Sequence, residues 1–158
     1  QNSQTTLHQW LNQMKQMILQ TRVMGYSLGG ILATYTVLRD YDLLSQNYCN
    51  GSIAFNPPGV TKKMLDQWQK IDDNKKPSFS SLIVKNDVVS MSGHFFGNAY
   101  VLTPSVNVNP VSAHVDLITA KQCFYLKLYD EMDEDFVSKN VRKFIDTTKT
   151  ITSDKKHR

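Results

Sequence analysis

The sequence contains one short motif in which a serine stands between two glycines: Gly25-Tyr26-Ser27-Leu28-Gly29. An apolar, strand-like run at 22–24 precedes the motif, and a segment of helical pattern follows it. A chain that turns this sharply from strand to helix holds the serine at the apex, in a strained conformation, with its hydroxyl exposed. We therefore predict that Ser27 is a nucleophile, and the alternative is a Gly/Ser-rich turn without chemistry.

The residues around Ser27 fit this prediction. Small residues at Gly25 and Gly29 are expected to avoid side-chain clashes within the tight turn. The helix that follows points the N–H groups of its first turn toward the serine. The N–H of Leu28 is then the expected donor to an oxyanion that develops on a bound carbonyl group.

A nucleophilic serine needs a general base, and four histidines are available. We expect His8, in the first predicted helix, and His157, in the basic C-terminal tail, to be surface residues. His114 follows a loop late in the chain and is the preferred base. His94 lies in a glycine-rich loop and stays open as an alternative base or as a pocket residue.

The base in turn needs an acid that orients it. Asp87 is the preferred acid because it follows the predicted strand at 81–85 directly, although an ordinary Asn-Asp turn would look the same. Asp72, Asp73 and Asp116 are poorer candidates because no predicted strand ends just before them.

Hydrophobic spacing predicts the elements that must position these groups. Apolar residues recur at helical spacing in four segments: 5–20, 31–40, 61–71 and 134–145. Three short apolar runs are typical of strands: 22–24, 52–55 and 81–85. The remaining predictions are a turn at 47–51, loops at 90–98 and 103–112, an added strand or hairpin arm at 99–102, a short helix at 113–123, and an ambiguous segment at 124–128. Helices that alternate with short strands favour an α/β fold with a mostly parallel sheet, in a single domain over 1–158.

Composition excludes several classes of protein. The 158 residues are 41% hydrophobic, which is sufficient for a core and argues against intrinsic disorder. The net charge is +4, but the basic residues are scattered rather than gathered into the stripe of a nucleic-acid-binding protein. No apolar run approaches the ~20 residues that span a bilayer. Two cysteines, Cys49 and Cys123, are too few for a zinc cluster, and we expect them to be buried or half-buried thiols.

Three segments resemble class 3 (fungal-type) lipases and related serine esterases of the α/β-hydrolase superfamily. The motif and the helix after it, residues 25–33, resemble the G-H-S-L-G-G-x-L-A elbow of that family. Residues 53–60, Ile-Ala-Phe-Asn-Pro-Pro-Gly-Val, are similar to the strand and turn that follow it there. Residues 85–90, Lys-Asn-Asp-Val-Val-Ser, resemble the segment that bears the acid. The similarity covers about residues 20–115.

The resemblance implies that Ser27 is the nucleophile, Asp87 the acid and His114 the base. It further implies hydrolysis of carboxylic esters, often of lipids or phospholipids, without a metal or organic cofactor. A secreted or host-delivered enzyme would fit the habit of the family. Contact with a membrane surface is a further, weaker expectation from the positive charge, and no nucleic-acid partner is expected.

The sequence departs from the family in three places. Tyr26 replaces the usual His before the serine. Few residues precede the motif, so the usual N-terminal strands, one of whose loops supplies the second oxyanion donor, are expected to be missing. The chain begins with Gln1 and has no signal peptide, which suggests a processed chain or a fragment. There is no clear lid, and the region 90–112 is either an apolar rim or ordinary loop packing.

The rival functions are a thioesterase or peptidase on the same fold, and a non-catalytic binding or assembly domain.

Overall fold

The computed structural model describes residues 2–17, 20–47, 49, 51–105, 107–116 and 124–129 of the chain. Its helices are α1 (Asn2–Gln16), α2 (Leu28–Arg39), α3 (Lys62–Gln69) and α4 (Pro110–Val115), with short 3₁₀ helices η1 (Tyr41–Leu43) and η3 (Asp73–Lys75). Its strands are β1 (Met24–Tyr26), β2 (Ser52–Phe55), β3 (Phe79–Val84), β4 (Asn98–Pro104) and β5 (Phe124–Tyr129).

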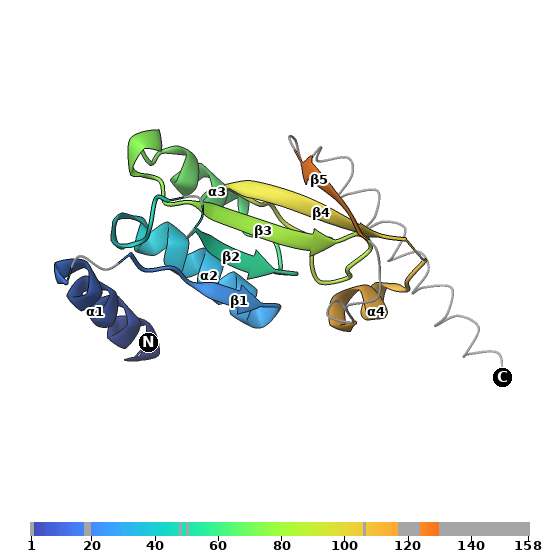
Figure 1. Cartoon of the computed structure of the whole chain (residues 1–158), viewed down its shortest axis with the longest axis horizontal. Helices are drawn as coiled ribbons and strands as arrows, with labels where there is room; N and C mark the ends of the chain where they lie inside the picture. The colour runs from blue at the N-terminus through green and yellow to red at the C-terminus, as the bar shows by residue number, and fades with distance from the viewer. Residues whose placement is uncertain are drawn as a thin grey trace.

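The five strands form one sheet in the order β1-β2-β3-β4-β5. The first four strands are parallel, and β5 pairs with β4 in the antiparallel direction (Figure 1). Helices connect the first three strands, as parallel pairing requires. The predicted α/β fold with a mostly parallel sheet flanked by helices is therefore confirmed.

Helix α2 packs against β1 and β2 and also contacts α3. The strand residues beneath these helices are buried, among them Ala54 on β2 and Phe79 on β3. Trp68 of α3 stacks on Phe96, with ring centroids 4.5 Å apart, and both side chains belong to the core. Phe96 thus takes part in core packing and not in an apolar rim.

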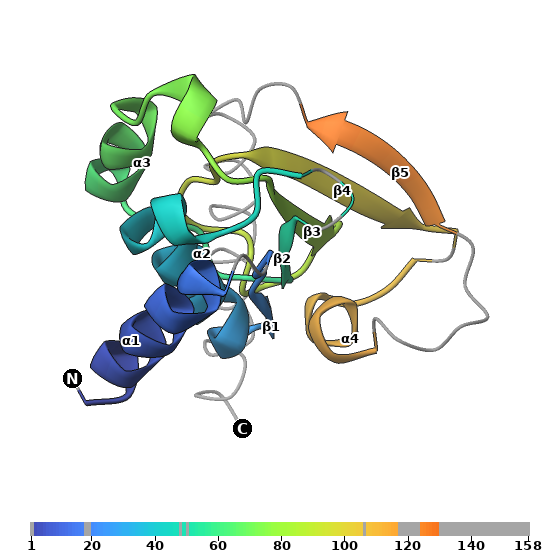
Figure 2. The same ribbon diagram turned by 60° about the vertical axis from the view of Figure 1, so that its left-hand side comes forward.

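Helix α1 lies at the β1 side of the molecule, far from β5, as both ribbon views show (Figures 1 and 2). Leu11 of α1 is fully buried and joins the hydrophobic core. Helix α1 also contacts η1, next to the C-terminal end of α2.

Several element boundaries differ from the sequence prediction. Helix α2 begins at Leu28 rather than residue 31, because the chain enters the helix directly from the serine turn. Helix α4 begins at Pro110, inside the predicted loop, because the Asn109 side chain accepts hydrogen bonds from the N–H groups of Val111 and Ser112 and caps the helix. The segment at 99–102 belongs to the longer parallel strand β4, and 124–128 lies in β5.

Other predictions can be compared only in part. Thr61, the first residue of the helix predicted at 61–71, caps α3, since its side chain accepts a hydrogen bond from the Met64 N–H. Cys49 is exposed, which corrects the prediction of a buried thiol. Cys123, the end of the short helix predicted at 113–123, and the helix predicted at 134–145 lie outside the described residues.

Candidate active site

Ser27 occupies the one-residue link between β1 and α2. Its backbone has φ 52° and ψ −117°, a conformation that non-glycine residues rarely adopt and that costs about 1–3 kcal/mol. Two hydrogen bonds hold this link: the Ser27 N–H donates to the Phe55 carbonyl, and the Ile31 N–H donates to the Ser27 carbonyl. The strained strand-to-helix turn predicted from the motif is therefore present.

The two glycines of the motif are needed to different degrees. A Cβ atom at Gly25 would lie 2.0 Å from the carbonyl oxygen of Gly29, so only glycine fits at position 25. A Cβ atom at Gly29 would meet no atom within 4 Å, so the expectation of a side-chain clash at position 29 is wrong. The next glycine, Gly30, is the close-packed one, because its Cβ would lie 3.0 Å from Pro57.

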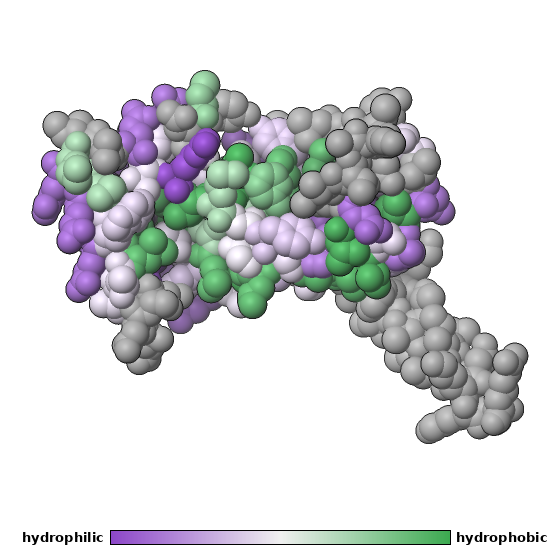
Figure 3. All heavy atoms as spheres, turned by 60° about the horizontal axis from the view of Figure 1, so that its bottom comes forward, coloured by the Kyte–Doolittle hydropathy of each residue, from purple (hydrophilic) through white to green (hydrophobic). Residues whose placement is uncertain are grey.

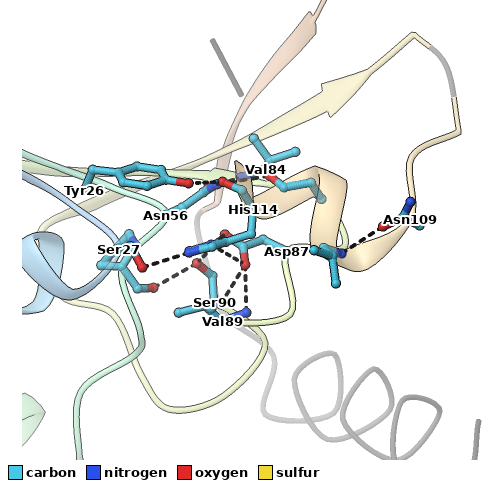
Figure 4. A network of polar contacts seen from close by, with 12 residues as sticks. Tyr26, Ser27, Asn56, Val84, Asp87, Val89, Ser90, Asn109 and His114 are labelled. Atoms are coloured by element: carbon cyan, nitrogen blue, oxygen red, sulfur yellow. Dashed lines mark hydrogen bonds and ion pairs between the residues drawn. The ribbon is translucent and has the colours of Figure 1, made fainter. Parts of the chain in front are cut away.

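The three predicted catalytic side chains form one hydrogen-bonded chain (Figure 4). His114 Nε2 lies 2.8 Å from Ser27 Oγ. His114 Nδ1 lies 2.9 Å from Asp87 Oδ2 and 3.0 Å from Oδ1. With the ring proton on Nδ1, the imidazole donates to the carboxylate and accepts from the serine hydroxyl, which is the arrangement a general base needs.

Topology explains why residues so distant in sequence meet. Ser27 follows β1, Asp87 follows β3, and His114 lies in α4, which comes after β4. Because β1, β3 and β4 are parallel, their carboxyl ends lie at the same edge of the sheet. Ligand sites of open α/β sheets lie at this edge.

Asp87 is buried, and its carboxylate is held by groups of its own turn. Oδ1 accepts hydrogen bonds from the N–H groups of Val89, at 2.7 Å, and Ser90, at 3.4 Å. The Ser90 hydroxyl donates to the Pro57 carbonyl at 2.8 Å and lies 3.3 Å from Asp87 Oδ2. These contacts leave the carboxylate oriented toward His114 without rotational freedom.

Two residues that the sequence analysis did not assign to the site contact the main chain of His114. The Tyr26 hydroxyl donates to the carbonyl of His114. The Asn56 side-chain amide donates to the carbonyls of Ala113, at 3.1 Å, and His114, at 3.3 Å. The unusual Tyr26 in the motif, and an Asn placed directly after a buried strand, were the signals that could have pointed to them.

The remaining candidates lie elsewhere. His94 is not the partner of Ser27, and its backbone pairs with Val60 in an isolated antiparallel bridge. His8 is exposed, as expected, and contacts Asp40 rather than the serine. His157 lies outside the described residues. Asp72 caps η3, so it has a structural role.

Leu28 is the first residue of α2, and its side chain is exposed. The N–H groups of a helix's first turn have no partner within the helix. The Leu28 N–H, in the residue that follows Ser27, therefore has no acceptor within the helix, and its role as oxyanion donor stays a prediction. The positive end of the helix dipole lies at the same place and favours a developing negative charge.

No protein-family model matches the chain, and no curated protein matches it significantly. Within the described residues, no cluster of three or more His, Cys, Asp or Glu side chains is suited to hold a metal ion. None of the described helices has the length and apolar character needed to cross a membrane.

Proposed function

We propose that this chain is a serine hydrolase of the α/β-hydrolase type that cleaves carboxylic esters. The observation that carries the proposal is the Ser27–His114–Asp87 hydrogen-bonded chain, with the serine on a strained turn at the carboxyl edge of the sheet. A serine merely structural in role does not require φ 52°, a glycine that no other residue can replace at position 25, and a histidine oriented by a buried carboxylate.

The reaction proceeds in two acyl-transfer steps. His114 Nε2 takes the hydroxyl proton as Ser27 Oγ attacks the ester carbonyl carbon. The Leu28 N–H stabilises the oxyanion, and the proton then passes from His114 to the departing alcohol oxygen. In the second step a water molecule gives a proton to His114 as it attacks the carbonyl carbon of the acyl-serine. His114 then returns that proton to Ser27 Oγ as the bond between this oxygen and the acyl carbon breaks, which releases the acid. Asp87 stabilises the imidazolium in both steps.

Apolar residues around the serine favour a substrate with a hydrocarbon chain, such as a lipid or phospholipid ester. Leu28 and Leu32 lie one turn apart on α2 and are exposed, and so are Val111 and Val115 on α4. Hydrophobic atoms gather over β1–α2 and over α4 on the face that Figure 3 shows. Leu28 follows Ser27 directly in the chain, and Val115 follows His114.

The test is a panel of p-nitrophenyl esters with acyl chains of two to sixteen carbons, together with matched thioesters and anilides. We expect the wild-type protein to hydrolyse the esters, to favour chains longer than acetyl, and to lose the activity in Ser27→Ala. Preference for the thioesters or anilides would assign a thioesterase or peptidase instead. Absence of turnover on every substrate by a folded protein would contradict the proposal and favour a binding domain.

A further inference from the structure

The carbonyl oxygen of His114 accepts hydrogen bonds from two side chains that come from different strands. The Tyr26 hydroxyl reaches it from the end of β1, and the Asn56 amide reaches it from the end of β2. An ordinary carbonyl in the last turn of a short helix would be left to water. Here both lone pairs of the carbonyl are used to fix the main chain of the histidine.

Tyr26 contacts the imidazole ring as well. The two rings are stacked, with centroids 5.4 Å apart and an angle of 26° between their planes. Tyr26 also precedes Ser27 directly in the chain. One residue therefore links the backbone of the nucleophile to both the ring and the main chain of the base.

Asn56 makes the corresponding link to the acid. Its side chain is fully buried, and its Oδ1 accepts the Val84 N–H at 2.8 Å while its Nδ2 donates to the carbonyls of α4. Val84 is the last residue of β3, three residues before Asp87. The backbone of Asn56 has φ 44°, a left-handed conformation that Asn tolerates better than most residues. The amide is thus the only side-chain type that satisfies one donor and two acceptors at this place.

We infer that Tyr26 and Asn56 are positioning residues that clamp His114 between the nucleophile and the acid. The inference rests on the proposed function, because it concerns the base of that reaction. The clamp sets the ring plane and the distance from Nε2 to Ser27 Oγ, while Asp87 sets the tautomer. The clamp therefore holds the base in place before the substrate binds. Loss of the clamp lowers the rate of acylation more than the affinity for the ester.

Tyr26 keeps the proton that the clamp needs. Burial and the nearby negative charges of Asp87 and Asp116 raise the pKa of its hydroxyl above the usual value of 10.0. The hydroxyl therefore remains a donor to the His114 carbonyl throughout the pH range in which a histidine base works.

The decisive variant is Tyr26→Phe, which removes the hydroxyl and keeps the stacked ring. Tyr35→Phe is a matched control, because Tyr35 has the same exposed fraction of 39% and lies on α2 away from the clamp. We expect Tyr26→Phe to lower kcat for a p-nitrophenyl ester about tenfold with little change in KM, and Tyr26→Leu to lower it further. Tyr35→Phe should leave both constants as in the wild type.

A double-mutant cycle separates positioning from a structural effect. If Tyr26 acts through the histidine, Tyr26→Phe causes no further loss of rate in a His114→Ala background. An equal loss in both backgrounds would overturn the proposal. Asn56→Asp tests the buried Asn56, because it keeps the size and the Val84 contact but turns a second oxygen toward the carbonyls. It should lower the rate of acylation, and circular dichroism checks whether the variant folds as the wild type does.

Proton NMR tests the clamp without relying on activity. In the wild type the Nδ1 proton of His114, bonded to Asp87, should give a sharp signal far downfield. Tyr26→Phe should broaden it through faster exchange with water, whereas Tyr35→Phe should not. An unchanged signal in Tyr26→Phe overturns the proposed clamp, even where the ester panel shows no turnover and the proposed function itself has failed.

Discussion

Among the residues that the structure describes, two histidine–aspartate pairs look alike at first sight. His114 Nδ1 lies 2.9 Å from the buried carboxylate of Asp87, and His8 Nδ1 lies 2.7 Å from the buried carboxylate of Asp40. The difference is at the other ring nitrogen. His114 Nε2 contacts a serine hydroxyl on a strained turn, while His8 Nε2 contacts the side-chain amide of Asn12 one helical turn away.

The surroundings of the two carboxylates also differ. Asp40 is paired with Arg39 in addition to His8, and the pairing raises the pKa of the Arg39 guanidinium, so the cation stays charged. The His8 side chain is 49% exposed, whereas that of His114 is 13% exposed. The His8–Asp40 pair therefore joins α1 to the end of α2, whereas the His114–Asp87 pair contacts the hydroxyl of Ser27. On the proposed function, the strained turn that carries Ser27 is what separates the His114–Asp87 pair from the His8–Asp40 pair.

The largest expected effect is the loss of turnover on removal of either reacting group. Ser27→Ala or His114→Ala should lower kcat for a p-nitrophenyl ester by about 10⁴-fold or more, because the nucleophile or its base is gone. His8→Ala and Asn12→Ala should keep the wild-type kcat. Steady-state kinetics on the four purified variants measures these changes in kcat. A comparable loss of kcat in His8→Ala would contradict the proposed difference between the two pairs.

Substitution of the two aspartates should have different effects, one on activity and the other on stability. Asp87→Asn should lower kcat by about 10³–10⁴-fold, because the amide favours the wrong tautomer of His114. Asp40→Asn should keep kcat but lower the free energy of unfolding by about 2 kcal/mol, since it breaks a buried hydrogen-bonded ion pair. Kinetics and urea unfolding of both variants measure this contrast, and equal losses of activity would contradict it.

The turn that carries Ser27 distinguishes the His114–Asp87 pair from the His8–Asp40 pair, and it can be tested at its glycines. Gly25→Ala should destabilise the protein by about 3 kcal/mol or more, because the new Cβ atom would lie 2.0 Å from a backbone oxygen. Gly29→Ala should be neutral or stabilise by up to about 1 kcal/mol, because its Cβ meets open space in the first turn of a helix. Thermal unfolding of the pair checks the prediction, and equal Tm values would show that the turn relaxes.

The smallest expected effect concerns alkaline pH. The pKa of Tyr26 is raised in the folded protein, chiefly by burial and then by Asp87 and Asp116. The protonated Tyr26 hydroxyl therefore contributes fully to the free energy of unfolding below the unfolded pKa of about 10. This contribution is lost as the pH rises through the higher pKa of the folded protein. The free energy of unfolding should fall more steeply above pH 10 in the wild type than in Tyr26→Phe. Parallel curves from urea titrations would show that the hydroxyl is not coupled to the fold.

The sequence was sufficient to predict that Ser27, Asp87 and His114 lie together, and two of these residues carry a local signal. The signals are the glycines around Ser27 and the position of Asp87 shortly after a strand. The choice of His114 over His94 followed from chain order, and parallel strands bring the two residues after β1 and β3 to the same edge. The α/β fold could also be predicted, because the hydrophobic spacing that indicates helices and strands lies in neighbouring residues.

The supporting groups could not be predicted because their partners are distant in sequence. Asn56 and His114 are 58 residues apart, and no local pattern shows that a side chain after β2 will meet a carbonyl in α4. In the sequence, Tyr26 is visible only as a replacement for the His that the family usually has before the serine. The start of α4 was missed because Asn109-Pro110 suits a loop as well as a helix cap. Gly29 shows that a motif residue can lack the steric cause assigned to it.

The central claim is that Ser27, and no other serine, is activated by His114. Labelling of the purified protein with a fluorophosphonate, followed by intact mass and peptide mapping, tests it most directly. We predict one adduct per chain on Ser27, lost in Ser27→Ala and His114→Ala and retained in His8→Ala and His94→Ala. A folded wild-type protein that stays unlabelled, or an adduct on a different serine, would contradict the account.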